Sequence, residues 1–418
     1  MNPSLLGHWN LFNFIKSFGD VPIMFTTISI YFLMLLLIFW SYCGYVILLF
    51  AFSVLGTKRK NDVAVCEELS KVAVIVPCYN EEAYVEQKIV NLKGLEYETE
   101  KLEVYFLDGK STDNTCKEIT RYISDMPNWH LIETGCRGKI NQINNGLSKI
   151  SNDVSIIVNT DMDAILSPDT LIKFIHEFNS DSRVAVVGAF IMPQGAIHIE
   201  ENSWEDQNLF RLIESNVYTS SIVVAPCYSY RASFIERFPE DCIADDIYIA
   251  FKANTEGYLT KYIESAKGSE IRTPKTFQDF FKHKFRKGNA YLVELFRYFY
   301  RLPYMPGWWK MIFLTKLLQF AIIPWVLPYF ILSTISLALS GWGLFQVALF
   351  GLIFLFISLV TTSFIMKKGR DRFLNYRKSK RFFNLHYFAV ANLILVLVGL
   401  SYPFYKQTSS YEKIERKK

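Results

Sequence analysis

The sequence predicts an α/β domain with a mostly parallel sheet, joined to a helical membrane region. Between residues 70 and 270, short apolar runs rich in β-branched residues alternate with segments of helical periodicity. This alternation is typical of βαβ units, whose parallel strands bind ligands beyond their carboxyl ends. Apolar runs of about 20 residues or more flank this region, and each is long enough to cross a bilayer core. At 418 residues, 51% of them hydrophobic, the chain can supply a core for both parts.

Four apolar runs are candidate membrane spans. They cover residues 23–56, 311–339, 343–366 and 386–405. The first is too long for a signal peptide, so it is expected to be an uncleaved anchor. The last contains Asn392 and is the weakest candidate, and the second contains Lys316 and two prolines.

Basic residues indicate the orientation of these spans. Residues 58–60 (KRK) follow the first run, and a second basic loop covers residues 367–381. Positive charge in short loops marks the cytoplasmic side, so residues 57–310 are predicted to be cytoplasmic and the protein to lie in a plasma or inner membrane. Because four spans would put the basic tail outside, one of the four runs is expected to be re-entrant or miscounted.

Charge and cysteine content exclude two kinds of site. The formal net charge of +5 is modest and its excess lies beside the apolar runs, which favours membrane lipid headgroups as partners. Nucleic acid is not an expected partner, because the basic residues form no separate domain. The seven cysteines contain no C-x-x-C pair, so free thiols are expected and a zinc site is not.

The α/β elements follow one another regularly along the chain. Predicted strands and the helices after them cover residues 72–77 and 81–92, 102–107 and 114–123, and 156–158 and 168–178. Each strand ends in a polar motif, and the carboxyl ends of parallel strands are where a site is expected.

Two carboxylates, Asp161 and Asp163, follow the third of these strands one residue apart. Side chains alternate along an extended chain, so both project to the same side if the chain stays extended here. Two hard oxygen ligands so placed suit Mg²⁺ or Mn²⁺ shared with the phosphates of a nucleotide. Taken alone, the pattern also fits a solvated turn after a buried strand.

Five motifs in order resemble glycosyltransferase family 2, and more narrowly its membrane-embedded polysaccharide synthases. The motifs are residues 76–82 (VPCYNEE), 108–115 (DGKSTDNT), 137–139 (RGK) leading to 145–147 (NGL), 161–163 (DMD) and 244–246 (ADD). Such synthases make cellulose, chitin, hyaluronan or poly-N-acetylglucosamine. The resemblance implies a GT-A fold, a UDP-sugar donor, a divalent cation and inversion at the anomeric carbon.

The resemblance also implies a donor site. It assigns nucleotide-sugar contacts to Pro77, Tyr79, Glu81, Asp108, Lys139 and Asp161. Asp163 would hold the metal together with Asp161. The family usually has two consecutive acidic residues after the second strand, whereas Gly109 follows Asp108 here, so only Asp108 is carried over. Asp113 is expected instead to cap the next helix.

Inversion is a single displacement by an acceptor hydroxyl, which needs a base to take its proton. The resemblance assigns that base to Asp246, with Asp245 in support. Both carboxylates also fit the start of a helix, where they interact favourably with its dipole. On the acceptor side, the resemblance points to Arg231, at the end of the segment 226–231 (PCYSYR).

Residues 276–301 are amphipathic and aromatic, which is typical of a helix at the membrane surface. The other interpretation is an ordinary helix packed on the catalytic domain. Processive synthases carry Gln-x-x-Arg-Trp on this helix, whereas alignment on Gly288 gives residues 281–285 (FKHKF) here. Lys284, Phe285 and Arg286 are the candidates for contacts with the diphosphate or the acceptor.

The sequence therefore predicts a membrane-bound inverting glycosyltransferase that extends a β-linked glycan with sugar from a UDP donor. The predicted regions are 1–56 (N-terminal segment and span), 57–270 (cytoplasmic GT-A domain), 271–310 (interfacial helices), 311–405 (C-terminal spans) and 406–418 (basic tail). Transfer of one sugar to a lipid carrier is the alternative, and it gains weight from the altered segment 281–285. A non-catalytic membrane adaptor is a third interpretation, and an accessory membrane subunit is left open.

Overall fold

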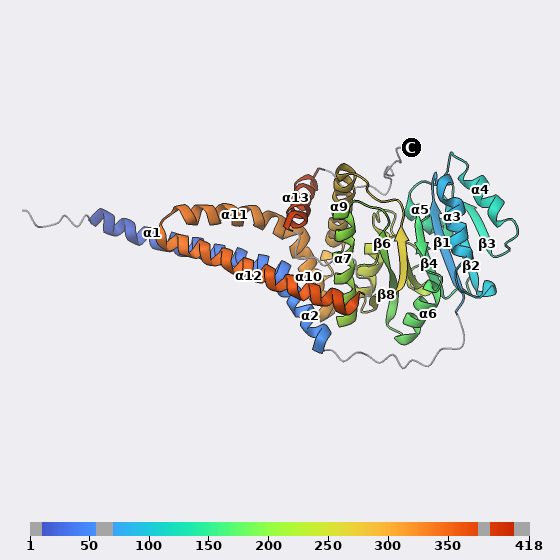
Figure 1. The fold of residues 1–418 in the computed structure, drawn as a ribbon, viewed down its shortest axis with the longest axis horizontal. Helices are drawn as coiled ribbons and strands as arrows, with labels where there is room; N and C mark the ends of the chain where they lie inside the picture. The colour runs from blue at the N-terminus through green and yellow to red at the C-terminus, as the bar shows by residue number, and fades with distance from the viewer. Residues whose placement is uncertain (1–10, 56–69, 375–384, 405–418) are drawn as a thin grey trace, which may run out of the picture.

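The computed structural model describes residues 11–55, 70–374 and 385–404. Figure 1 shows an α/β domain at one end of the molecule and long helices projecting from it. Three of the predicted basic segments lie wholly or partly outside the described residues: 58–60, the end of the basic loop from 375 onward, and the tail 406–418.

Within the described residues, eight strands form one mixed sheet in the order β3-β2-β1-β4-β7-β6-β8-β5. The strands are β1 (Val72–Cys78), β2 (Leu102–Asp108), β3 (Trp129–Glu133), β4 (Ile156–Thr160), β5 (Ala164–Leu166), β6 (Val184–Pro193), β7 (Cys227–Arg231) and β8 (Leu259–Glu270). β1 pairs in parallel with β2 and β4, so the carboxyl ends of these strands meet at one edge. β7 runs antiparallel to both β4 and β6. The predicted α/β sheet is confirmed, with antiparallel strands added on one side.

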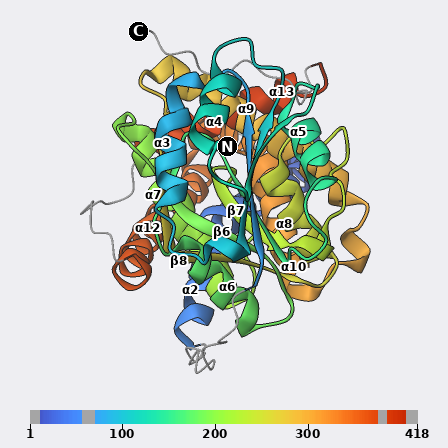
Figure 2. The same cartoon turned by 90° about the vertical axis from the view of Figure 1, so that its right-hand side faces the viewer.

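Strands β1, β2 and β4 are buried on both faces, which explains why they appear as continuous apolar runs. In β1, Val72, Val74 and Val76 face one hydrophobic core while Ala73 and Ile75 face the other, because side chains alternate along a strand. Figure 2 shows helices on both sides of the strands. These helices are α3 (Glu82–Lys93), α4 (Thr115–Ile123), α5 (Lys139–Leu147), α6 (Thr170–Ser180), α7 (His198–Val217) and α8 (Asp245–Thr255). α3, α4 and α6 confirm the three predicted helices to within a few residues.

In the part of the chain that the structure describes, three helical stretches are long and apolar enough to span a membrane. They cover Met24–Leu55, Gly307–Leu339 and Trp342–Phe373. The first joins α1 (Leu11–Phe39) to α2 (Tyr45–Leu55), the second joins α10 (Gly307–Leu317) to α11 (Ile323–Leu339), and the third is α12. A short π-helix connects the two parts of each of the first two stretches.

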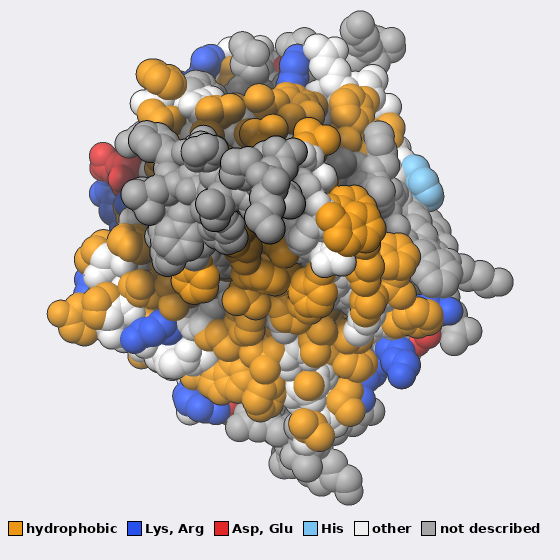
Figure 3. All heavy atoms as spheres, turned by 90° about the vertical axis from the view of Figure 1, so that its left-hand side faces the viewer, with side chains coloured by type: hydrophobic (Ala, Val, Ile, Leu, Met, Phe, Trp, Pro, Cys, Tyr) orange, Lys and Arg blue, Asp and Glu red, His pale blue; other side chains and the backbone are white. Residues whose placement is uncertain are grey.

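The outer faces of these stretches are apolar. Figure 3 shows hydrophobic side chains over much of the face from which the long helices project. Leu33 of α1, Tyr329 of α11 and Phe356 of α12 are each more than half exposed. A contiguous apolar surface of this kind is stable in lipid and unfavourable in water.

The fourth apolar run forms α13 (Leu385–Ser401), which is shorter than the three spanning stretches. It packs along α11 and along α9 (Phe277–Phe299), where a Cβ at Gly288 would lie 3.3 Å from Val398. Asn392 accepts a hydrogen bond from the Tyr42 hydroxyl, which accounts for the polar residue in this run. This agrees with the expectation that one of the four runs is not a full span.

A buried ion pair connects the α/β domain to the second spanning stretch. Lys316 Nζ lies 2.8 Å from a carboxylate oxygen of Glu214 on α7, which is 1% exposed. The Tyr45 hydroxyl and the Ser221 backbone N–H also donate to this carboxylate. Burial opposes ionisation of Glu214, but Lys316 and these donors outweigh it and hold the pKa below its ordinary value. The lysine in an otherwise apolar run therefore has a partner in the α/β domain.

Candidate active site

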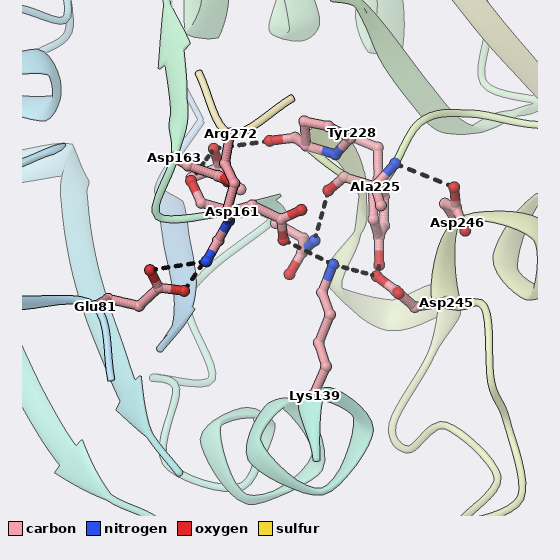
Figure 4. Close-up of polar contacts among 12 residues, drawn as sticks. Glu81, Lys139, Asp161, Asp163, Ala225, Tyr228, Asp245, Asp246 and Arg272 are labelled. Atoms are coloured by element: carbon pink, nitrogen blue, oxygen red, sulfur yellow. Dashed lines mark hydrogen bonds and ion pairs between the residues drawn. The ribbon is translucent and has the colours of Figure 1, made fainter. Parts of the chain in front are cut away.

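The two predicted metal-binding carboxylates lie in a tight turn between β4 and β5. The backbone N–H of Ala164 donates to the carbonyl of Asp161, which closes this turn. The chain is therefore not extended at this point, so the condition for both side chains to project to the same side is not met, and they reach different partners. Asp163 is 4% exposed, whereas Asp161 is half-buried. Figure 4 shows both beside Lys139 and Arg272.

Lys139 joins Asp161 to the predicted base region. It is the first residue of α5, and Gly138 before it has a φ of 97°, a conformation that favours glycine. Lys139 Nζ lies 2.9 Å from Asp161 Oδ1 and 3.2 Å from Asp245 Oδ2. The buried Tyr228 hydroxyl donates to the same Asp245 oxygen at 2.7 Å. One ammonium group thus connects two motifs that are far apart in the sequence.

Asp245 and Asp246 begin α8, which confirms the predicted position of the acidic pair at the start of a helix, while the role of Asp246 as base stays a prediction. Asp246 accepts hydrogen bonds from the backbone N–H groups of Ala225, at 3.1 Å, and Ile247, at 3.0 Å. These bonds fix the direction of the carboxylate. Burial, and next the charge of Asp245, raise the pKa of Asp246 to about 6. Its carboxylate is therefore ionised at neutral pH yet basic enough to take a proton.

Arg272 bridges two carboxylates and was not predicted from the sequence. It follows β8, and its Nε lies 2.9 Å from Asp163 Oδ2. Its two Nη atoms lie 3.1 and 3.3 Å from the two oxygens of Glu81, which is 3% exposed. Burial raises the pKa of the Asp163 carboxyl, and the Arg272 charge opposes that shift. The rule that polar residues follow strand ends would have found Arg272 had β8 been predicted as a strand.

The first two motifs also lie at this edge of the sheet. Pro77 is paired with Leu107 in the sheet, and the Tyr79 ring lies 5.0 Å from the Arg137 guanidinium. Asp108, which ends β2, is 3% exposed and accepts the Ser111 backbone N–H at 3.1 Å. The predicted donor-side residues therefore gather along the carboxyl ends of β1, β2 and β4.

A steric contact explains why a glycine, and not a second acidic residue, follows Asp108. A Cβ at Gly109 would lie 1.8 Å from Gln142 Nε2 and 2.8 Å from its Cδ. The Gln142 amide is buried and donates to the Cys78 carbonyl, so an aspartate at position 109 would displace it. The N-cap residue of α4 is Asn114, and not Asp113 as was predicted. The Asp113 side chain nevertheless accepts the backbone N–H groups of Thr115 and Glu82, the first residues of α4 and α3.

The predicted acceptor contact of Arg231 is wrong. β7 runs antiparallel to β4, so Arg231 pairs with Ile156 at the start of β4. Asp161 follows the other end of the same strand. Its guanidinium donates to the backbone carbonyls of Val184 and Phe178, both at 2.8 Å. Arg231 therefore has a structural role beside the start of β4.

Two of the three residues predicted on α9 have their side chains directed away from the candidate site. Lys284 Nζ lies 2.8 Å from the fully buried Glu200 of α7, and Phe285 stacks on Phe281 against the hydrophobic core. These two residues are not brought to the cluster of Figure 4, and Arg286 remains a predicted contact. The inner face of α9 is buried against the rest of the protein, as one interpretation predicts, while Phe277, Phe296 and Phe299 are exposed. A location at the membrane surface stays a prediction.

Lys287, which was not predicted, is an α9 lysine whose charge acts on the candidate base. Burial raises the pKa of Asp246, and the Lys287 charge opposes that shift. Lys287 Nζ lies 4.9 Å from the Trp204 ring. Helical periodicity could have indicated that Lys287 lies on the inner face of α9. His283 and Lys284, four and three residues before it, both contact the buried Glu200.

Lys88 lies beneath the turn that carries Asp161 and Asp163. This α3 lysine is fully buried, and its Nζ donates to Thr160 Oγ1 and to the Ala164 carbonyl, both at 2.8 Å. Burial lowers the pKa of Lys88 to about 8, and the charges of Asp161 and Asp163 oppose that shift. Lys88 therefore holds both ends of the turn and places a positive group behind its carboxylates.

Replacing Lys88 with methionine is expected to weaken binding of Mn²⁺ with UDP by about tenfold or more, because loss of one charge-assisted hydrogen bond costs about 1.5–3 kcal/mol. Calorimetry would measure the affinity, and circular dichroism would check that the fold persists. Lys93→Met, at an exposed position of the same helix, is the control and should bind as the wild type does. Unchanged affinity in a folded Lys88→Met variant would show that Lys88 does not position the turn.

The carboxylates present fit one kind of metal site. Among the described residues, no group of three or more His, Cys, Asp or Glu side chains could hold a metal ion. Mg²⁺ and Mn²⁺ in nucleotide sites, however, need only one or two carboxylates, because substrate phosphates supply further ligands. Asp161 and Asp163 thus fit a cation shared with a diphosphate and do not fit a metal held by the protein alone.

Two protein-family models match the chain. The model described as Glycosyl transferase family 2 matches residues 73–238, and that described as Glycosyl transferase family group 2 matches residues 156–366, about half of the chain. The poly-beta-1,6-N-acetyl-D-glucosamine synthase of Staphylococcus aureus is 26% identical over 237 residues, 54% of this chain and 56% of the synthase. The probable glycosyltransferase YdaM of Bacillus subtilis is 22% identical over 249 residues, 55% of this chain and 58% of that protein. Each alignment spans just over half the length of the relative.

A solved structure shares the overall fold. The mannosyltransferase PcManGT from Pyrobaculum calidifontis, in complex with GDP-Man and Mn²⁺, has a TM-score of 0.65 and 22% sequence identity, covering 91% of this chain and 100% of that one. The fold is thus a GT-A-like domain joined to apolar helices. The family model over half of the chain is decisive, and this chain belongs to glycosyl transferase family 2, with a distant relationship to poly-N-acetylglucosamine synthase.

Proposed function

We propose that this chain is a membrane-bound inverting glycosyltransferase that transfers sugar from a UDP-sugar to a growing β-linked glycan. The observation that carries the proposal is the contact of Lys139 with both Asp161 and Asp245. It places the donor-side carboxylates and the acidic pair around one ammonium group. A diphosphate bound there would lie between a positive group and a base.

In this proposal Asp246 takes the proton of an acceptor hydroxyl as that oxygen attacks the anomeric carbon. The bond between the anomeric carbon and the diphosphate oxygen breaks, and UDP leaves with the electron pair. The backbone N–H groups of Ala225 and Ile247 hold Asp246 in one orientation during this step. Asp163 and Asp161 would hold a divalent cation, which as a Lewis acid neutralises charge on the departing diphosphate.

A panel of radiolabelled sugar nucleotides tests the proposal. Membranes containing the full chain would be incubated with Mn²⁺ and each donor, and label in a glycan or lipid product would be counted. The panel includes UDP-N-acetylglucosamine, because one relative is a synthase of an N-acetylglucosamine polymer, and GDP-mannose, because PcManGT binds it. Transfer from a UDP-sugar is expected, whereas transfer from GDP-mannose alone would contradict the proposed donor.

A second candidate function, transfer of one sugar to an anionic lipid carrier, is favoured by α9. The aromatic residue that would stack on an acceptor sugar, Phe285, packs inward, while the positive charge of Lys287 acts on the candidate base. An ammonium group suits a phosphate better than a neutral sugar ring. Product length separates the two functions, because a polymerase gives a ladder of chains and a lipid glycosyltransferase gives a single glycolipid.

We propose that the α/β domain lies on the cytoplasmic side of a plasma or inner membrane. With the three spans found among the described residues, the α/β domain and the basic residues at the end of α12, Arg370 and Arg372, would lie on the same side, which is consistent with the positive-inside rule. A cysteine-accessibility assay in right-side-out vesicles would test this topology, and labelling of the α/β domain without disruption of the vesicles would contradict it.

The pH profile is expected to report the pKa of Asp246. Below about pH 6, kcat/KM should fall roughly tenfold per pH unit, because the base becomes protonated. The charged groups that act on Asp246 are Asp245, which raises its pKa, and Lys139 and Lys287, which lower it. Lys287→Met should therefore move the acid limb to higher pH and Asp245→Asn to lower pH. Acid limbs that coincide in all three proteins would contradict the assignment of Asp246.

A further inference from the structure

The guanidinium of Arg272 pairs with Asp163, the carboxylate that the proposed function assigns to the metal. Figure 4 shows Arg272 between Asp163 and Glu81. One bond, from Nε, reaches Asp163 at 2.9 Å, while two bonds at 3.1 and 3.3 Å reach Glu81. One oxygen of the carboxylate proposed to hold the cation, Asp163 Oδ2, is therefore already paired with a positive group.

Arg272 is well placed to hold this position. Its side chain is 20% exposed, and those of Asp163 and Glu81 are 5% and 3% exposed, so all three are mostly screened from water. The guanidinium also lies 5.4 Å from the ring of Tyr84. Hydrogen bonds between ionised groups gain strength where water is excluded. Two mostly buried carboxylates without this guanidinium would be costly.

Only one of the three bonds has to break for a cation to reach Asp163. The two bonds to Glu81 can keep the guanidinium in place while the Nε–H turns away from Asp163. The backbone N–H of Ile271 donates to the Asp163 carbonyl at 3.0 Å, so the two segments stay joined during this change. The exchange therefore needs a side-chain rotation and no rearrangement of the fold.

We propose that Arg272 is a placeholder cation that holds Asp163 until a divalent cation arrives with the nucleotide diphosphate. The inference rests on the proposed function, since it takes Asp163 as the metal ligand. An ion that must displace the guanidinium binds weakly by itself, because only the fraction of molecules with Asp163 released is competent. The diphosphate adds ligands that outweigh this cost. Metal and nucleotide then bind together, and the metal alone does not accumulate in the site.

The test measures Mn²⁺ binding to the full chain in detergent, using the electron paramagnetic resonance signal of free Mn²⁺. Wild type, Arg272→Gln and Arg183→Gln are titrated with Mn²⁺ alone and with Mn²⁺ plus UDP. Arg183 pairs with Asp181 at the surface, so its variant also removes an arginine–aspartate pair but one remote from the site. Without UDP, Arg272→Gln should bind Mn²⁺ about tenfold more tightly than wild type, a difference of about 1.4 kcal/mol. Arg183→Gln should match the wild type.

UDP should also improve Mn²⁺ affinity by a smaller factor in Arg272→Gln than in wild type, because the variant no longer has to release Asp163. Equal Mn²⁺ affinity of wild type and folded Arg272→Gln without UDP would overturn the inference. If Arg272→Gln does not fold, a wild-type structure with Mn²⁺ and UDP decides: the bond from Arg272 to Asp163 should be broken and those to Glu81 kept. An intact bond to Asp163 in that complex would overturn the inference but not the proposed function. Failure of wild type to bind Mn²⁺ with UDP would overturn both.

Discussion

Replacing Asp246 with asparagine is expected to lower kcat by about 10²- to 10⁴-fold, the range that general-base catalysis contributes. The asparagine side chain keeps the size of the aspartate and still accepts hydrogen bonds from Ala225 and Ile247 through its amide oxygen. It cannot take the acceptor proton. The affinity for UDP with Mn²⁺ should remain within a few-fold of wild type, because Asp246 is not among the donor-side residues. Steady-state kinetics and calorimetry would measure the two quantities separately.

Two control variants give this prediction its specificity. Asp125→Asn, at an exposed turn outside the site, should leave kcat unchanged. Asp161→Asn should instead weaken binding of UDP with Mn²⁺, because Asp161 lies on the donor side. Full transfer by Asp246→Asn would remove the base from the proposed mechanism. Loss of UDP binding in Asp246→Asn would show that this carboxylate supports the donor site and would leave the base unidentified.

The centre of the fold could be predicted because its signals are local. β1, β2 and β4 are buried on both faces, so each appears in the sequence as a short continuous apolar run. The motifs after these strands then meet for a simple reason, since the carboxyl ends of parallel strands lie at one edge. Asp108, Lys139 and Asp161 were placed correctly at this edge by that argument and by the family resemblance.

The residues that were misplaced or missed depend on information that a local pattern does not contain. Arg231 was misplaced because nothing in residues 226–231 reveals that β7 is antiparallel to β4. Arg272 was missed because its partners, Glu81 and Asp163, are more than a hundred residues away. Lys88 lies on a helix whose other lysine, Lys93, is exposed, and only the tertiary structure distinguishes the two.

In the membrane region, too, local features could be predicted from the sequence and tertiary contacts could not. Length and composition were sufficient to find the three spanning stretches, because crossing a bilayer imposes both. They did not explain Lys316, which looks unfavourable in an apolar run until its partner on α7 is known. The ionic contact between Lys316 and Glu214 is thus a specific connection between the helices and the catalytic domain, and it carries the second large prediction.

Replacing Lys316 with methionine is expected to destabilise the folded protein by about 3–5 kcal/mol, the usual cost of leaving one partner of a buried ion pair uncompensated. Thermal unfolding of the full chain in detergent would show this as a lower midpoint. The double variant Glu214→Gln with Lys316→Met should recover much of the loss, because no buried charge remains. Lys101→Met, which removes an exposed pair with Glu98, should cost less than about 1 kcal/mol.

The pH dependence of this loss identifies its cause. In wild type the folded-state pKa of Glu214 lies below its ordinary value, so its stabilising contribution is present at neutral pH and is lost as pH falls through that lowered pKa. In Lys316→Met, burial acts without the lysine and raises this pKa, so the variant is least stable at high pH and recovers as Glu214 takes up a proton. A deficit relative to wild type that stays constant from pH 8 to pH 5 would mean that lost packing of the lysine stem, and not an unpaired carboxylate, is the source. A deficit that shrinks over the same range would establish the ion pair as the connection between the membrane helices and the catalytic domain.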